Sequence, residues 1–221
     1  ILFRERNILY KFPIFFYCNV ILMSCTPADI TSDITNSCDL RCKLVTDYPS
    51  QGITCNGYRK DYGVGLSIAG IENLNSDLNF TPYIVNEITI VKPSWHRYGG
   101  RTVAAEMIIV HKSPDKNDKL FIICIPIIQG NTSSDLDDII HKAGMSPPQE
   151  AAFDLNNFIP QHPYYSYKGG LKYMDSCLGT GNEILVFQKR HALRLLNDNL
   201  KIIPTGTNFK FATQDGESIS F

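Results

Sequence analysis

The sequence has almost no excess of charge of either sign. Its 221 residues include 21 Lys and Arg against 22 Asp and Glu, which gives a formal net charge of −1. This balance carries no broad electrostatic signal for nucleic acid or for an anionic membrane. We therefore expect no nucleic acid among its partners. Internal repeats and long low-complexity tracts are also absent, and a hydrophobic content of 43% is enough for one compact domain with a sizeable core.

A continuous apolar run long enough to span a membrane is missing as well. Residues 8–23 are apolar but are interrupted by a lysine, a proline and an asparagine, whereas a spanning helix needs about 20 apolar residues. Residues 1–22 fit three interpretations: a signal peptide, an apolar anchor that contacts a partner or a membrane, or a leader that is not translated natively. In the last case Met23 is the natural start. We therefore divide the chain into residues 1–22 and a domain over residues 23–221.

Short runs rich in Ile and Val dominate the domain, as is typical of β-strands. The expected strands are Tyr83–Val91, Ala104–His111, Leu120–Ile128 and Ile184–Phe187. One helix is expected over Ser134–Ala143, because a serine can cap it, three aspartates suit its first turn and Gly144 can end it. The pattern predicts a mainly β protein of the α+β type with few short helices.

Histidine is scarce, but one histidine-containing segment is informative. Residues 95–111 read WHRYGGRTVAAEMIIVH. This segment resembles, without a gap, the α-carbonic anhydrase segment H-T-V-D-G-x-x-x-x-A-E-L-H-L-V-H. The matching residues are His96, Gly100, Ala105, Glu106, Val110 and His111. The resemblance implies the fold of that family, which is a large, twisted, mostly antiparallel β-sheet with few short helices.

Four further blocks are similar to segments of the same family and occur in its order at roughly its spacing. They are Cys25–Ile30, Asn56–Tyr58, Leu120–Gly144 and Phe158–Phe187. The last of them carries a Y-Y-x-Y-x-G pattern and, further on, a Cys and a Val-Phe pair at matching places. The ordered set extends the resemblance over about residues 23–192.

The family's zinc ligands are missing from the sequence. Three neutral imidazoles normally hold Zn²⁺ and leave a fourth position open for a water that ionises near neutral pH. The resemblance matches these ligand positions to Thr89, Val91 and Ile108, none of which binds zinc as imidazole does. A one-residue slip does not help, because no histidine lies between Asn79 and Trp95. We therefore expect that the protein is not an enzyme and holds no metal or other cofactor.

Two polar residues of the family's site are retained. The resemblance assigns His96 and Glu106 to the shell that orients the zinc ligands through hydrogen bonds. One interpretation is that the two side chains now bond each other or nearby backbone, since buried polar groups need partners. The other is a rebuilt metal site formed by His96, Glu106 and His111, which would leave a residual zinc lyase. Cys124 lies inside an apolar strand and is expected to be a core residue.

Tyrosines gather in the stretch that borders the active-site mouth in the family. Tyr164, Tyr165 and Tyr173 are candidate anchors of a protein or glycan interface, because aromatic side chains often dominate binding energetics. The alternative is that Tyr165 and Tyr167 are packing residues of the core or of the sheet edge. Basic clusters such as Lys189–His191 are short, and we expect them to be solvated.

Catalytically silent carbonic anhydrase-like domains are known as adhesion or interaction modules. Abundant Ile and Asn with scarce Ala suit an AT-rich genome such as that of a large DNA virus. We therefore expect a structural or interaction protein located in a virion, namely a minor capsid component held by other capsid proteins. The alternative is a secreted or cell-surface adhesin that binds glycan, although the near-zero net charge does not favour polyanion capture.

Overall fold

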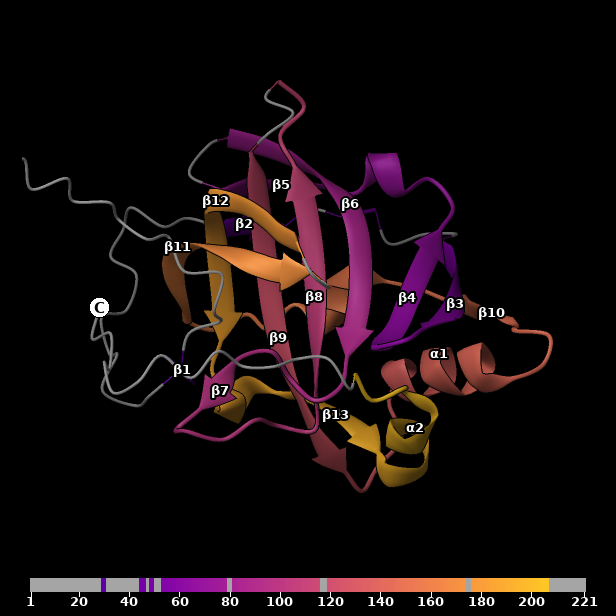
Figure 1. The fold of residues 1–221 in the computed structure, drawn as a ribbon. Coiled ribbons are helices and arrows are strands. Elements are labelled where there is room, and N and C mark those ends of the chain that lie inside the picture. The colour runs from indigo at the N-terminus through magenta and orange to yellow at the C-terminus, as the bar shows by residue number, and fades with distance from the viewer. Residues whose placement is uncertain are drawn as a thin grey trace, which may run out of the picture.

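The central feature of the structure is one large β-sheet (Figure 1). The computed structural model describes residues 29–30, 44–46, 48–49, 53–78, 81–115, 119–173 and 176–206, and the side chains of residues 170–181 are not among those described. Within these residues the sheet has 11 strands and is mostly antiparallel. The predicted fold class is therefore confirmed.

Eight strands form the main path of the sheet. In pairing order they are β10 (Glu150–Ala152), β3 (Thr54–Lys60), β4 (Gly63–Ile68), β6 (Thr81–Val91), β8 (Ala105–Lys112), β9 (Leu120–Gly130), β12 (Ser176–Phe187) and β11 (Tyr164–Tyr173). Three more join at the side: β5 (Asn75–Leu78) pairs with β6 and with β2 (Leu44–Thr46), and β13 (Leu193–Leu196) pairs with β9. A separate parallel pair joins β1 (Asp29–Ile30) to β7 (Arg97–Tyr98).

Helices are few and short. The α-helices of the described residues are α1 (Asp135–Gly144) and α2 (Asn197–Ile202), and the 3₁₀ turns are η1 (Ile71–Asn73), η2 (Leu155–Phe158) and η3 (Lys189–His191). Figure 1 shows α1 and α2 next to each other at one end of the sheet. No helix of the described residues is long and apolar enough to cross a membrane.

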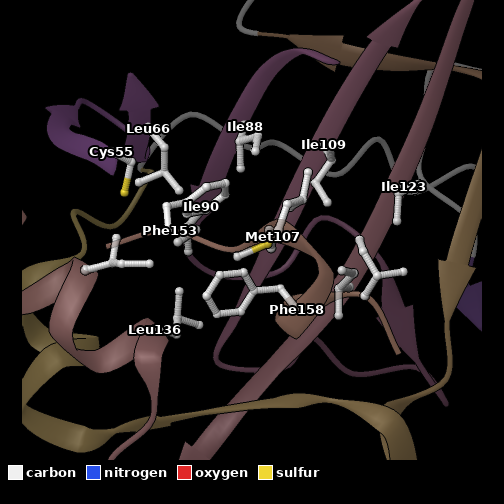
Figure 2. Close-up of a cluster of buried hydrophobic side chains, with 14 of the residues drawn as sticks. Cys55, Leu66, Ile88, Ile90, Met107, Ile109, Ile123, Leu136, Phe153 and Phe158 are labelled. Carbon is white, nitrogen blue, oxygen red and sulfur yellow. The ribbon is translucent and has the colours of Figure 1, made fainter. Parts of the chain in front are cut away.

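The central strands are apolar on both faces because both faces of the sheet are buried. In β8, Met107 and Ile109 belong to one hydrophobic cluster, whereas Ile108 and Val110 belong to a second cluster. Successive side chains of a strand point to opposite faces, so the two clusters lie on the two sides of the sheet. Figure 2 shows the first cluster, to which α1 contributes Leu136. The continuous Ile and Val runs of the sequence follow from this arrangement.

Pro126 stands in the middle of β9, where a proline would normally break the ladder. On one side β9 pairs with β8 at residues 120–127, and on the other it pairs first with β12 at residues 121–124 and then with β13 at residues 127–130. Pro126 lies in the gap between these two partners. The missing N–H therefore costs little, because the strand changes neighbours at that point.

Helix α1 is specified by its ends and by one glycine of the sheet. Ser134 caps the helix, and the Asp137 carboxylate accepts hydrogen bonds from the Ser134 backbone N and hydroxyl, both at 2.9 Å. Gly57 of β3 lies under the helix, and a Cβ there would come within 2.2 Å of the Ala143 Cβ. Close packing of α1 on the sheet thus requires glycine at position 57.

The expected strands and the expected helix are confirmed, with ends that differ by at most two residues, except that β12 begins at Ser176, eight residues before the expected Ile184. Helix α2 was not expected, because six residues are too few to show a periodic pattern and Leu196 at its start offers no capping side chain. The interpretations of residues 1–22 concern a part of the chain outside the described residues.

Candidate functional site

The three ligand positions come together on neighbouring strands. Thr89 and Val91 lie on β6, two residues apart and on one face, and Thr89 is the cross-strand partner of Ile108 on β8. Val91 and Ile108 are buried in the second hydrophobic cluster, and Thr89 is only 2% exposed. The three side chains therefore lie in one region of the sheet, on the face of the second cluster.

Side chains fill the region around these positions. Trp95, Tyr62 and Val103 are among the residues of the second cluster that includes Val91 and Ile108. Valine and isoleucine carry no atom that coordinates a metal, and a zinc site needs at least three protein ligands of nitrogen, sulfur or oxygen. The residues present at the ligand positions do not fit the family's zinc ion.

Thr89 is the polar member of the three, and it is bonded to a lysine and a glutamate. Its hydroxyl donates to Glu87 Oε1 at 2.9 Å and accepts from Lys60 Nζ at 3.2 Å. Lys60 and Glu87 also form an ion pair with each other. Burial alone would lower the pKa of Lys60, but its bond to Glu87 raises that pKa overall, so the ammonium stays charged. The Lys60 ammonium and the Glu87 carboxylate thus lie beside Thr89, one of the three positions matched to zinc ligands.

The Lys60–Glu87 pair was not found from the sequence. Glu87 carried a usable signal, since it precedes Thr89 by two residues and must share its face of the strand. No local pattern places Lys60 at this site, because only the pairing of β3 with β4 and of β4 with β6 brings it next to Glu87.

His96 and Glu106 form a buried, fully hydrogen-bonded pair. His96 Nδ1 lies 2.8 Å from Glu106 Oε1, and Glu106 Oε2 accepts from the backbone N atoms of Trp95 and His96 at 2.8 and 3.1 Å. Both side chains are fully buried. The first interpretation of the two residues, mutual hydrogen bonding together with backbone, is therefore confirmed.

Two tyrosines extend this pair into a network. Tyr98 donates to Glu106 Oε1 at 2.9 Å, and the Tyr167 hydroxyl lies 2.7 Å from His96 Nε2. Burial alone would raise the pKa of Glu106, but His96, the backbone donor and Tyr98 lower it overall, so the carboxylate is ionised. Burial and the nearby Glu106 in turn raise the pKa of Tyr98, which stays a donor. The network links β7, β8 and β11.

His111 does not join His96 and Glu106, so the expectation of a metal site from these three residues is wrong. It lies on β8 an odd number of residues from Glu106 and faces the opposite side of the sheet. There its Nε2 lies 2.8 Å from the Tyr48 hydroxyl and its Nδ1 3.3 Å from the Phe121 carbonyl oxygen. Burial lowers the pKa of His111 to about 3, so the imidazole is neutral.

Cys124 comes nearer to the retained pair than the sequence indicated. It lies on β9 directly opposite Ile108, and its sulfur, a His96 ring nitrogen and a Glu106 carboxylate oxygen all lie within 4.8 Å of one another. Burial, and then the negative charge of Glu106, raise the pKa of the Cys124 thiol. A thiolate ligand is therefore disfavoured here unless a cation replaces the proton.

The candidate interface tyrosines have different surroundings. Tyr165 is 7% exposed, lies in the second cluster and accepts a hydrogen bond from Gln188, so it is a core residue and unavailable as a surface anchor. Tyr164 is half-buried and packs edge-on against Phe187. The side chain of Tyr173 lies outside the described residues. A surface role for Tyr164 or Tyr173 stays a prediction.

Comparison with known proteins supports the fold. No protein-family model and no curated protein sequence matches the chain. Among solved structures, it is similar to the α-carbonic anhydrase of Thermovibrio ammonificans in complex with sulfanilamide, with a TM-score of 0.67 and 17% identity over 84% of this chain and 79% of that one. The α-carbonic anhydrase of Photobacterium profundum gives a TM-score of 0.65 and 16% identity over 83% and 81%.

A third similar structure is that of dioscorin in complex with ascorbate. It gives a TM-score of 0.65 and 21% identity over 82% of this chain and 76% of dioscorin. Identities this low establish the fold and no more. The chain has an α-carbonic anhydrase-like fold.

Proposed function

We propose that this protein is a non-catalytic α-carbonic anhydrase-like domain that acts as a structural or interaction protein. The observation that carries the proposal is the state of the ligand positions. Val91 and Ile108 are buried among apolar side chains, and Thr89 is bonded to Lys60 and Glu87. This arrangement offers neither three zinc ligands nor an open fourth position for a reactive water.

The activity test compares the full-length protein with an active α-carbonic anhydrase under the same conditions. We expect CO₂ hydration at the buffer rate and no stoichiometric zinc in elemental analysis after dialysis against ZnCl₂. Sulfonamide-sensitive hydration together with one bound zinc per chain would refute the proposal.

Within this class we propose a minor capsid component of a virion that is held by contacts with other capsid proteins. The balanced charge favours protein–protein contact over capture of a polyanion. A stable contact of this kind buries more than about 1,000 Å² in total. A secreted or cell-surface adhesin that binds glycan is the alternative.

The assembly proposal is tested on the protein in its native particle or extract. Cross-linking and mass spectrometry should recover capsid proteins, and Tyr164→Ala or Tyr173→Ala should weaken the association. Tyr58→Ala is a matched control, because Tyr58 is an exposed tyrosine on β3, at a different edge of the sheet. The proposal would be contradicted if the protein is a free monomer in its native extract, or if its associations survive both substitutions. Glycan-dependent cell binding would support the alternative.

A rebuilt zinc site is a second candidate, and one observation favours it. Ligand atoms of His96, Glu106 and Cys124 lie within 4.8 Å of one another. If zinc bound there, Cys124→Ser would remove it, whereas Cys55→Ser, which changes another buried free cysteine, would not. Zinc retained by the Cys124 variant would exclude this site.

A further inference from the structure

Side chains that can carry positive charge gather at the open end of the β11–β12 hairpin. This end is marked by the pairing of Tyr164 with Phe187. His162 precedes β11 by two residues, and η3, which contains Lys189, Arg190 and His191, follows β12. Lys189, Arg190 and His162 are exposed, and His191 is half-buried.

The two histidines are stacked. Their ring centroids are 3.8 Å apart and the ring planes differ by 17°. Arg190 Nε donates a hydrogen bond to His191 Nε2 at 3.0 Å, and because arginine keeps its protons, this nitrogen must offer a lone pair. His191 is thus a neutral imidazole with its proton on Nδ1. The Nδ1–H donor of His191 and the ring nitrogens of His162 therefore lie close to the guanidinium of Arg190.

Among the described residues, no carboxylate forms an ion pair with this cluster. Burial, then His162 and Arg190, lower the pKa of His191, and the last two act as like charges. Lys189 and Arg190 form no ion pair with a carboxylate in the part of the chain that the structure describes. β9, which packs against η3, carries no charged side chain, and the next charged residue along the chain is Arg194. An anion placed here would meet only attraction from these groups.

An open hollow of about 470 Å³ lies beside His162. Its polar lining includes Thr46, Gln161 and Tyr164, and Val45 and Phe187 contribute apolar surface. Hydroxyl and amide groups beside apolar side chains suit a small polar molecule that carries a charged group. The cationic cluster and the hollow share His162, so one ligand can contact both.

We propose that this end of the hairpin binds a small ligand through a sulfate or phosphate group, with the anion held by Arg190, His162 and His191. Binding becomes tighter as His191 takes up a proton, because this proton adds positive charge next to the anion and frees Arg190 Nε from its bond to His191 Nε2. The site is separate from the ligand positions, and its existence does not depend on whether the protein binds zinc or joins a virion.

The test uses sodium sulfate, because sulfate itself does not change charge between pH 5 and 8. The histidine Cε1–H signals of the full-length protein are titrated by NMR with sulfate and with chloride at equal ionic strength. We expect sulfate to raise the pKa of His191 and to bind about threefold or more tightly at pH 5.5 than at pH 7.5. Glucose 6-sulfate should bind more tightly than sulfate, because its sugar ring can contact the hollow; equal affinities would overturn the placement of a ligand in the hollow.

Variants assign the effect to the cluster. His162→Asn and Arg190→Gln should each weaken sulfate binding about threefold or more, and His191→Asn should reduce its pH dependence. His141→Asn is the matched control, since His141 is an exposed histidine on α1 and should leave sulfate binding unchanged. Thermal unfolding checks that each variant is folded. Sulfate-induced shifts equal to those with chloride, or full binding by a folded His162→Asn variant, would overturn the proposal.

Discussion

Thr89 and Ile108 face each other across β6 and β8, so two of the three positions matched to zinc ligands meet as a direct cross-strand pair. The two positions differ in chemistry. Thr89 keeps polar contacts with Lys60 and Glu87, whereas Ile108 is 1% exposed among apolar side chains. Packed side chains and hydrogen bonds thus stabilise the region that the resemblance matches to the metal site of the family.

Ile108→Ala should destabilise the protein by about 2–5 kcal/mol, because it leaves a cavity in a closely packed cluster. Chemical denaturation of the wild type and the variant measures the difference. Val45→Ala is the control, since Val45 is 40% exposed, and should change the free energy of unfolding by less than about 0.5 kcal/mol. A neutral Ile108→Ala substitution would show that the region is loosely filled.

Tyr167→Phe should cost about 1–2 kcal/mol, because it removes the hydroxyl that lies 2.7 Å from His96 Nε2 and leaves a buried nitrogen without that partner. The free energy of unfolding at pH 7 is the measurement. Tyr58→Phe removes a hydroxyl from an exposed tyrosine and should be nearly neutral. Equal effects of the two substitutions would contradict a special role of the His96–Glu106 network.

His111 should make the protein less stable as the pH falls below about 6.5. Burial lowers its pKa in the folded state to about 3, so the unfolded chain takes up the proton first and is favoured between these two values. The loss should approach about 1.4 kcal/mol per pH unit within that window.

The measurement compares unfolding free energies from pH 7 to pH 5 in the wild type and in His111→Gln. The slope that belongs to His111 should disappear in this variant and persist in His141→Gln, whose histidine is exposed. An unchanged slope in His111→Gln would mean that the buried imidazole does not contribute.

Asp137→Ala should destabilise the protein by about 2–3 kcal/mol. The buried carboxylate accepts hydrogen bonds from Ser134, from the Leu196 backbone N at 2.8 Å and from Asn199 Nδ2 at 2.6 Å, and so ties α1 to β13 and α2. Hydrogen exchange should show faster opening of α2 in the variant. Asp135→Ala, an exposed aspartate of the same helix, should have little effect on either quantity.

Much of the fold was predictable from local pattern. β-Branched runs indicated the central strands, and Ser134 with the following aspartates indicated α1, because strand preference and helix capping act between neighbours in the chain. Helix α2 was missed because its main anchor, Asp137, lies about 60 residues away in the sequence.

The sequence by itself determined that the positions matched by the resemblance to zinc ligands, Thr89, Val91 and Ile108, carry no imidazole, since the identity of a side chain fixes whether it can coordinate a metal. It could not decide what surrounds these positions, because strand register and the pairing of distant strands are set only in the assembled sheet. The tertiary structure alone brought Tyr48 to His111, Lys60 to Glu87 and His162 to His191, because each contact joins segments that are distant in the sequence.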